Sequence, residues 1–176
     1  MKTTATILFK LKKCLFIFIV SVTCFSFGLS VHAQEAPPRP ISLYVNPAQG
    51  LIFGAFFQGV AGGSVIIYPD GSRSVTGDLL QANLGLPFSP AIFEIDANPG
   101  TVISILNGPD AILTGSNGGS LTLHVGNAST GTIFISSAIS PDRTQVRIGG
   151  TLTAGSPLAN PAGVYSGSFS VTLIQE

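Results

Sequence analysis

Residues 63–80 read GSVIIYPDGSRSVTGDLL, and this stretch decides the fold class. Two runs rich in Val, Ile and Leu lie on either side of Pro69-Asp70-Gly71. Proline presets its own backbone angle, aspartate caps a turn, and glycine accepts a positive φ, so this tripeptide favours a tight turn. Because β-branched runs flank that turn, Gly63–Leu80 is predicted to form an antiparallel β-hairpin.

The same pattern continues along the chain after residue 40. Short runs alternate apolar and polar residues with the period of a β-strand, and glycine and proline separate them. A second hairpin is expected where residues 91–96 lead through Asn98-Pro99-Gly100 into 101–106. Further strands are expected at 41–45, 51–57, 111–114, 121–125, 131–137, 144–148, 151–154 and 164–174. About nine to eleven short strands, with no apolar run at helical spacing, indicate an all-β sandwich or barrel.

The first 33 residues have the pattern of a secretory signal peptide. Residues 1–13 carry four lysines and no acid, and residues 14–29 read CLFIFIVSVTCFSFGL. Val31-His32-Ala33 then places small side chains three and one positions before a cleavage point. Because the apolar run is shorter than the roughly 18–20 residues of a spanning helix, a signal peptide is favoured over a retained membrane anchor.

Cleavage after Ala33 would leave one domain with a modest negative charge. That chain has 176 − 33 = 143 residues and a net charge of 4 − 8 = −4, because all four lysines are removed. Residues 34–40, QEAPPRP, form a proline-rich leader, and residues 41–176 are expected to be one β domain. Four scattered arginines make no basic stripe, so nucleic acid is not expected as a partner. After cleavage the chain is not expected to be an integral membrane protein.

Three motifs carry a resemblance to a known family. They are Leu51-Ile-Phe-Gly54, Val146-Arg-Ile-Gly-Gly-Thr-Leu152 and, near the C-terminus, Gly163-Val-Tyr-Ser-Gly-Ser-Phe-Ser-Val171. Their arrangement resembles the secreted bacterial family called domain of unknown function 4402, over residues 41–176. That family is similar to spore coat protein U and to the subunits of archaic chaperone–usher pili.

The resemblance implies an immunoglobulin-like antiparallel β-sandwich, secreted to the periplasm or the cell surface of a bacterium. It implies a structural or surface role and no catalytic residues. Two features depart from the relatives. Coat-protein and pilin relatives often carry a disulfide, whereas residues 34–176 contain no cysteine. Pilin subunits also need a donor strand outside the folded body, and residues 41–45 could serve as one only if the body folds without them.

Histidine chemistry has little support in the predicted domain. His124 lies between Leu123 and Val125 in a predicted strand, so its ring is expected on the opposite, solvent-facing side. Neither a G-x-S-x-G motif nor a cysteine accompanies it. A surface histidine is therefore favoured over a general base or a zinc ligand.

Glu94 and Asp96 are the pair of acids at the strand period of two, so both side chains should share one face. Phe93 and Ile95 should then face the core. Such a pair could act in glycoside hydrolysis, or bind calcium together with Asp110, but a solvent-facing strand is the simpler interpretation. No catalytic, cofactor-binding or metal-binding residue is therefore predicted.

Three tyrosines and one sequon are the other candidates for binding or modification. Tyr44, Tyr68 and Tyr165 could stack on sugars, but their wide spacing in the sequence indicates no shared platform. Tyr165 is expected to be structural, with its ring packed and its hydroxyl bonded to a neighbouring loop. Asn127-Ala-Ser129 matches the N-glycosylation sequon.

The sequence favours a protein whose role is contact rather than catalysis. Only 12 of the 143 residues after Ala33 are charged (four Arg and eight acids) and none is lysine, so little protects the strands against edge pairing. We expect an exported, non-enzymatic surface protein with a structural or adhesive role in a fibre, pilus-like structure or coat. Its partners would be other copies or surface-fibre subunits. A monomeric carbohydrate- or ligand-binding β-sandwich is the alternative, and an enzyme that uses Glu94, Asp96 or His124 is the third hypothesis.

Overall fold

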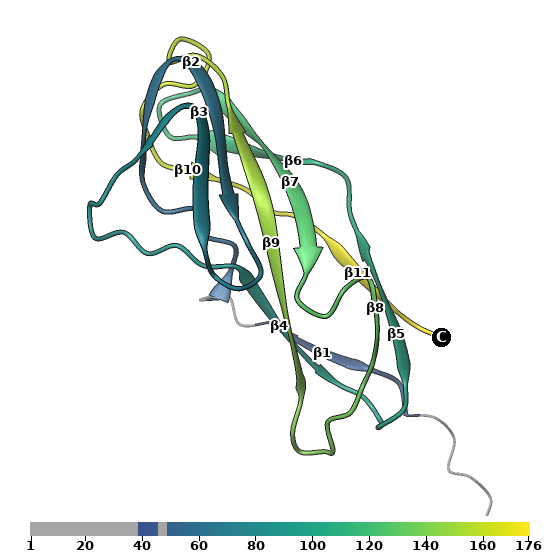
Figure 1. Cartoon of the computed structure of the whole chain (residues 1–176). Coiled ribbons are helices and arrows are strands. Elements are labelled where there is room, and N and C mark those ends of the chain that lie inside the picture. The colour runs from purple at the N-terminus through teal and green to yellow at the C-terminus, as the bar shows by residue number, and fades with distance from the viewer. Residues whose placement is uncertain (1–38, 46–48) are drawn as a thin grey trace, which may run out of the picture. The chain divides into compact units, whose positions relative to one another are not determined.

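The computed structural model describes residues 39–45 and 49–176, and eleven strands and no α-helix lie in this part of the chain (Figure 1). The strands are β1 (Ser42–Val45), β2 (Phe56–Ile67), β3 (Arg73–Gln81), β4 (Ala91–Asp96), β5 (Val102–Asn107), β6 (Ala111–Gly115), β7 (Ser120–Ala128), β8 (Ile133–Ile135), β9 (Thr144–Ala154), β10 (Tyr165–Ser166) and β11 (Val171–Gln175). The predicted signal peptide and residues 34–38 of the leader lie outside the described residues.

Two antiparallel sheets make up the domain, and β9 is the central strand of the larger one (Figure 1). β7 pairs with one side of β9, while β2 and β4 share the other side. β2 pairs with residues 150–154 and β4 with residues 144–148, so β2 and β4 follow one another along β9. β3, β1, β6 and β10 extend this eight-stranded sheet, and β11, β5 and β8 form the second sheet. The predicted all-β antiparallel sandwich is confirmed.

Alternation along the strands builds a core of two clusters. In β7, Leu121, Leu123 and Val125 are buried while Thr122 and His124 are exposed, as a period of two requires. The first cluster consists of Phe53, Val65, Ile67, Leu79, Leu113, Leu121, Leu123, Leu152 and Ala154. The second cluster joins the two sheets and consists of Ile95, Ala97, Ile103, Ile105, Val125, Val146 and Ile148. Phe169 packs against both clusters and so links them.

The hairpin predicted from residues 63–80 is confirmed by the pairing of β2 with β3. Its turn has the predicted chemistry, because Gly71 has a φ of 90° and the Tyr68 amide donates to the Ser72 carbonyl at 2.9 Å. Asp70 Oδ1 accepts hydrogen bonds from the Ser72 hydroxyl at 2.6 Å and from the Ser72 amide at 2.8 Å. These two bonds, the hydroxyl first, hold the pKa of the Asp70 carboxyl below its ordinary value.

The predicted second hairpin at residues 91–106 is wrong, although both of its strands form. β4 pairs with β1 and β9 in the large sheet, whereas β5 pairs with β8 and β11 in the small one. The Gly100 amide donates to the Ser136 carbonyl at 2.8 Å, so the chain entering β5 already pairs beside β8. Ile95 and Ile103 are buried in the same cluster from opposite sheets. The turn at 98–100 is therefore an arch between sheets, because the inward residues of both strands meet across the core.

Residues 144–148 and 151–154 were expected to be separate strands, and this is also wrong. β9 runs through Gly149 and Gly150 without interruption. A Cβ atom on Gly149 would collide with the Ile67 carbonyl oxygen, and one on Gly150 would lie 2.8 Å from Leu51 Cδ2. The glycine pair therefore allows other groups to pack closely on the central strand, and it does not mark a loop.

Two more predicted strands have different limits in the structure. Within residues 51–57 only an isolated bridge from Ile52 to Ser89 forms before β2 begins, since Gly54 turns the chain at a φ of 68°. The strand predicted at 164–174 is divided into β10 in the large sheet and β11 in the small one. A Cβ on Gly167 would lie 2.7 Å from the Ile112 carbonyl oxygen, so the chain leaves the large sheet at a close backbone contact. Phe169, Val171 and Leu173 all pack against the second core cluster.

Candidate interaction surface

The outer face of the three-stranded sheet is aliphatic. Ile133 and Ile135 are 62% and 65% exposed, Leu106 is 59% exposed and Ile174 is 43% exposed. The strand register brings these side chains and half-buried Val102 to the same side of the sheet. We name the following set the aliphatic face: Val102 and Leu106 of β5, Ile133 and Ile135 of β8, and Ile174 of β11.

Alternation along β5 places the aliphatic face on the outer side of the sheet. Ile103 and Ile105 are buried in the second core cluster, so the strand period places their neighbours on the outer side. Ser104 lies in the middle of the face, and its hydroxyl donates to Glu176 Oε1 at 2.6 Å. Glu176 therefore brings a negative charge next to side chains that are otherwise aliphatic.

β8 is also an open strand edge. In the described part of the chain it pairs only with β5, and backbone hydrogen bonds from Ile105 to Thr132 and from Ser136 to Thr101 lengthen that pairing. Residues 132–136 contain no charged residue and no proline, which are common means of blocking edge pairing. A partner could therefore contact this edge and the adjoining aliphatic face together.

The middle of the outer face of the eight-stranded sheet is polar, although Ile112 of β6, opposite Thr122, is 58% exposed at its side. Thr76, Ser64, Thr153 and Thr122 form one row of hydroxyls across β3, β2, β9 and β7. Ser64 Oγ and Thr153 Oγ1 are 3.4 Å apart in this row. We name these four residues the polar face.

β1 pairs inside its own domain with β4, from Ser42 opposite Asp96 to Val45 opposite Phe93. The Arg143 guanidinium lies 3.6 Å from the centre of the Tyr44 ring. The same group donates to Glu94 Oε2 at 3.0 Å, and this hydrogen bond raises the pKa of Arg143. Residues 42–45 therefore belong to the folded body and are not a free donor strand.

Glu94 and Asp96 share one face, as predicted, while Phe93 and Ile95 belong to the core side. Glu94 forms an ion pair with Arg143 at 3.0 Å. Asp96 Oδ1 is buried, and it has no hydrogen-bond partner among the described residues. Within residues 39–45 and 49–176, no cluster of three or more His, Cys, Asp or Glu side chains could hold a metal ion.

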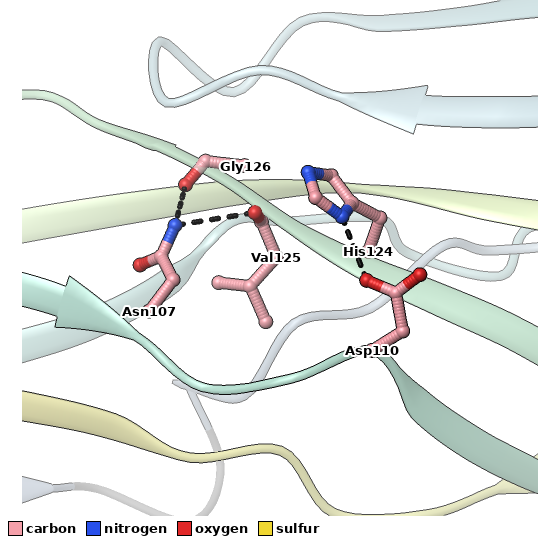
Figure 2. A network of polar contacts seen from close by, with 5 residues as sticks. All are labelled: Asn107, Asp110, His124, Val125 and Gly126. Atoms are coloured by element: carbon pink, nitrogen blue, oxygen red, sulfur yellow. Dashed lines mark hydrogen bonds and ion pairs between the residues drawn. The ribbon is translucent and has the colours of Figure 1, made fainter.

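His124 is on the exposed side of β7, as predicted, and its Nδ1 lies 2.7 Å from Asp110 Oδ1 (Figure 2). Beside this pair, Asn107 Nδ2 donates to the Val125 and Gly126 carbonyls at 3.2 and 2.9 Å. These bonds tie the end of β5 to β7 and so connect the two sheets. No sequence motif singles out Asn107, because its role depends on a contact between separate strands.

The three tyrosines have separate environments. The structural role of Tyr165 is confirmed: its ring packs on the first core cluster, and its hydroxyl donates to the Pro161 carbonyl at 2.6 Å. Tyr44 lies on β1, and Tyr68 follows β2 at the turn into β3. The sequon residue Asn127 is exposed on β7.

Asn160 is a structural residue that the sequence does not single out. It is buried, and its Oδ1 accepts a hydrogen bond from the Gly155 amide at 2.5 Å. Its Nδ2 donates to the Ser120 carbonyl. The side chain therefore fixes the loop after β9 to the start of β7.

None of the described residues form a helix long and apolar enough to cross a membrane. No curated protein and no solved structure matches the chain. A family model with the description "Domain of unknown function (DUF4402)" matches residues 43–174, a range that includes strands of both sheets. The chain therefore belongs to the DUF4402 family.

Proposed function

We propose that this protein is an exported, non-enzymatic surface protein with a structural or adhesive role. In this proposal it binds other copies, or the subunits of a surface fibre, through the aliphatic face and the β8 edge. The observation that carries the proposal is the exposure of Ile133, Ile135 and Leu106 on one side of a single sheet.

Burial of the aliphatic face would favour association with a partner. Fully burying one leucine or isoleucine stabilises a complex by about 1.5–3 kcal/mol relative to leaving it exposed. Contiguous aliphatic patches on a protein surface mark interaction sites more often than isolated apolar residues do. A second copy could stack its own aliphatic face on the first, in the way that two sheets pack at about 10 Å.

The β8 edge would add directional contacts to that apolar contact. A strand from a partner could pair with the free side of residues 132–136 and form backbone hydrogen bonds, which is the β-augmentation mode of recognition. A relation of the DUF4402 family to spore coat protein U and to pilus subunits, which we infer from the sequence motifs alone, would favour an assembly of this kind. The non-enzymatic part is supported by the pairing of Glu94 with Arg143, which occupies that carboxylate.

Sedimentation velocity over a range of concentrations tests the proposal on protein expressed from the full-length gene. The wild-type protein should form dimers or larger species as its concentration rises. Joint Ile133→Lys and Ile135→Lys substitution should weaken this association by about 100-fold or more, because it places two charges in the buried contact.

A matched control distinguishes this effect from a general effect of added charge. Thr122→Lys with Thr153→Lys places the same two charges on the polar face and should leave association unchanged. A wild-type protein that stays monomeric up to millimolar concentration and adds to no surface fibre would contradict the proposal. Equal weakening by both pairs of lysines would contradict it as well.

A further inference from the structure

An open groove of about 600 Å³ lies beside β9 where that strand changes neighbours. On one side of β9, pairing with β2 ends at Gly150 and pairing with β4 starts at Ile148. On the other side, the register between β7 and β9 shifts between Val125 and Ala128. The groove is lined by Gln145 and Arg147 of β9, by Tyr68, Pro69 and Asp70 at the β2–β3 turn, and by Ala128 and Ser129 at the end of β7.

The local sequence explains why this place is hollow. Gly149 carries no side chain, and a Cβ there would lie 3.2 Å from Pro69 Cδ. The turn after β2 can therefore approach the central strand closely. Gln145 and Arg147 alternate with buried Val146 and Ile148, so their side chains are on the outer side of the sheet.

Internal hydrogen bonds hold several of the polar groups of the groove in place. Arg147 Nε donates to Gln145 Oε1 at 3.1 Å. The Arg147 amide donates to Ser129 Oγ at 3.0 Å, and the Ser129 amide donates to the Arg147 carbonyl at 2.7 Å. At the β2–β3 turn, Asp70 Oδ1 accepts the two bonds from Ser72. The groove therefore has preorganised polar groups, which lowers the entropy cost of binding a ligand.

Two of these groups have hydrogen-bonding atoms that are available to a ligand. Among the residues that the structure describes, the terminal nitrogens of Arg147 make no hydrogen bond and no acid lies within 4.0 Å of them. Asp70 Oδ2 likewise has no described partner. A guanidinium with two available nitrogens matches a carboxylate in bidentate geometry. A separate carboxylate accepts hydrogen bonds from hydroxyls.

The residues that line the groove also restrict the chemical class of ligand that the groove can bind. The groove lies on the central strand, whose backbone already pairs on both sides near Arg147, so it offers no free edge for an extended peptide. Tyr68, which is 43% exposed, and Pro69 add two rings on which the apolar side of a sugar ring could pack. The volume lies within the roughly 300–1,000 Å³ range of small-molecule sites.

We propose that this groove binds a saccharide that carries carboxylate groups, such as an oligomer of a uronic acid. Arg147 takes the carboxylate, Asp70 and Gln145 bond the hydroxyls, and the ring of Tyr68 packs on the sugar. This binding activity goes beyond the contact role proposed for the aliphatic face, and it uses the other sheet. It matches the ligand-binding hypothesis that the sequence leaves open.

Titration calorimetry with trigalacturonate tests the site on protein expressed from the full-length gene. Wild-type protein should bind one trisaccharide per chain with saturation. Arg147→Ala should weaken binding by at least about tenfold, the effect expected for loss of a charge-assisted hydrogen bond. The affinity of Arg147→Lys should lie between the affinities of wild type and Arg147→Ala, because lysine keeps the charge but not the bidentate geometry.

The control variant is Arg39→Ala, which removes an exposed arginine that bonds Asn98 outside the groove and should leave affinity unchanged. Maltotriose, a neutral trisaccharide, should bind at least about tenfold more weakly than trigalacturonate. Amide chemical shifts of the wild-type protein give a readout that needs no variant, and they should change at Tyr68, Asp70, Gln145 and Arg147. Absence of saturable trigalacturonate binding, equal affinity for maltotriose, or shift changes confined to other residues would overturn the proposal.

Discussion

The centres of the two outer faces differ in composition, although alternating strands produce both. The polar face presents a row of hydroxyls, whereas the aliphatic face presents leucine, isoleucine and valine side chains. Alternation determines which side chains point out of a sheet, and composition determines whether water or another surface is the better partner for them. A strand position that faces outward is therefore not always a position suited to solvent.

The strands that carry the two faces also differ in how many neighbouring strands they have. The polar face lies over β3, β2, β9 and β7, and the last three of these strands have neighbours on both sides, whereas β3 pairs only with β2 among the described strands. The aliphatic face includes β8, which pairs only with β5 among the described strands. An apolar face and an open edge thus coincide in the small sheet, and this coincidence is the basis of the proposed contact role.

The largest expected effect comes from comparing two isoleucines on opposite sides of the small sheet. Ile103→Ala removes a fully buried side chain and should cost about 2–5 kcal/mol of unfolding free energy. Ile133→Ala removes a side chain that is 62% exposed and should cost less than about 1 kcal/mol in the dilute protein. Urea unfolding of both variants at low concentration measures the difference. A similar loss for both would show that Ile133 is covered within its own chain and that the aliphatic face is not free.

A moderate effect is expected at β1, an edge strand that a specific side-chain contact holds in place. Tyr44→Ala removes the ring on which Arg143 stacks, so β1 should open more often. Amide exchange at residues 42–45 should speed up by up to about tenfold, while exchange in β9 should not change. Tyr44→Phe keeps the aromatic ring and should retain the wild-type rate. Unchanged exchange in Tyr44→Ala would show that backbone pairing alone holds β1.

The smallest effect is expected from the charged turn between β2 and β3. Hydrogen bonds from Ser72 lower the folded-state pKa of Asp70 below the unfolded value of 3.8, so they stabilise the fold above that pH. This contribution is lost as the pH falls through the lowered folded-state pKa. Ser72→Ala should therefore reduce the unfolding midpoint near pH 6 and have less effect near pH 2, with Ser74→Ala as the control. A Ser72→Ala deficit of the same size at both pH values would contradict the assignment.

Much of the fold could be predicted because turn chemistry and alternation are local signals. Pro69-Asp70-Gly71 identified the β2–β3 hairpin, and alternation placed His124 and Glu94 on outward faces. Alternation does not report which strand lies alongside another, so the arch at 98–100 was mistaken for a hairpin turn. For the same reason the sequence pattern predicts a break at Gly149 and Gly150, although these glycines permit close packing on β9.

The candidate surfaces are harder to predict from the sequence than the strands are. The common face of Ile133 and Ile135 follows from alternation, but their juxtaposition with Leu106 and Ile174 depends on the pairing order β11-β5-β8. The groove at Arg147 depends on β2 ending where β4 begins along β9. Both features arise from contacts between distant segments, and one sequence carries no direct signal for them.

Amide exchange at low and at high protein concentration tests most directly whether the aliphatic face is the contact surface. Each amide then reports whether its own strand becomes protected when molecules associate. Raising the concentration should slow exchange at residues 102–106 and 132–136 and leave residues 120–124 of β7 unchanged. Protection that appears in β7 or β9 instead, or no concentration dependence anywhere, would contradict the account.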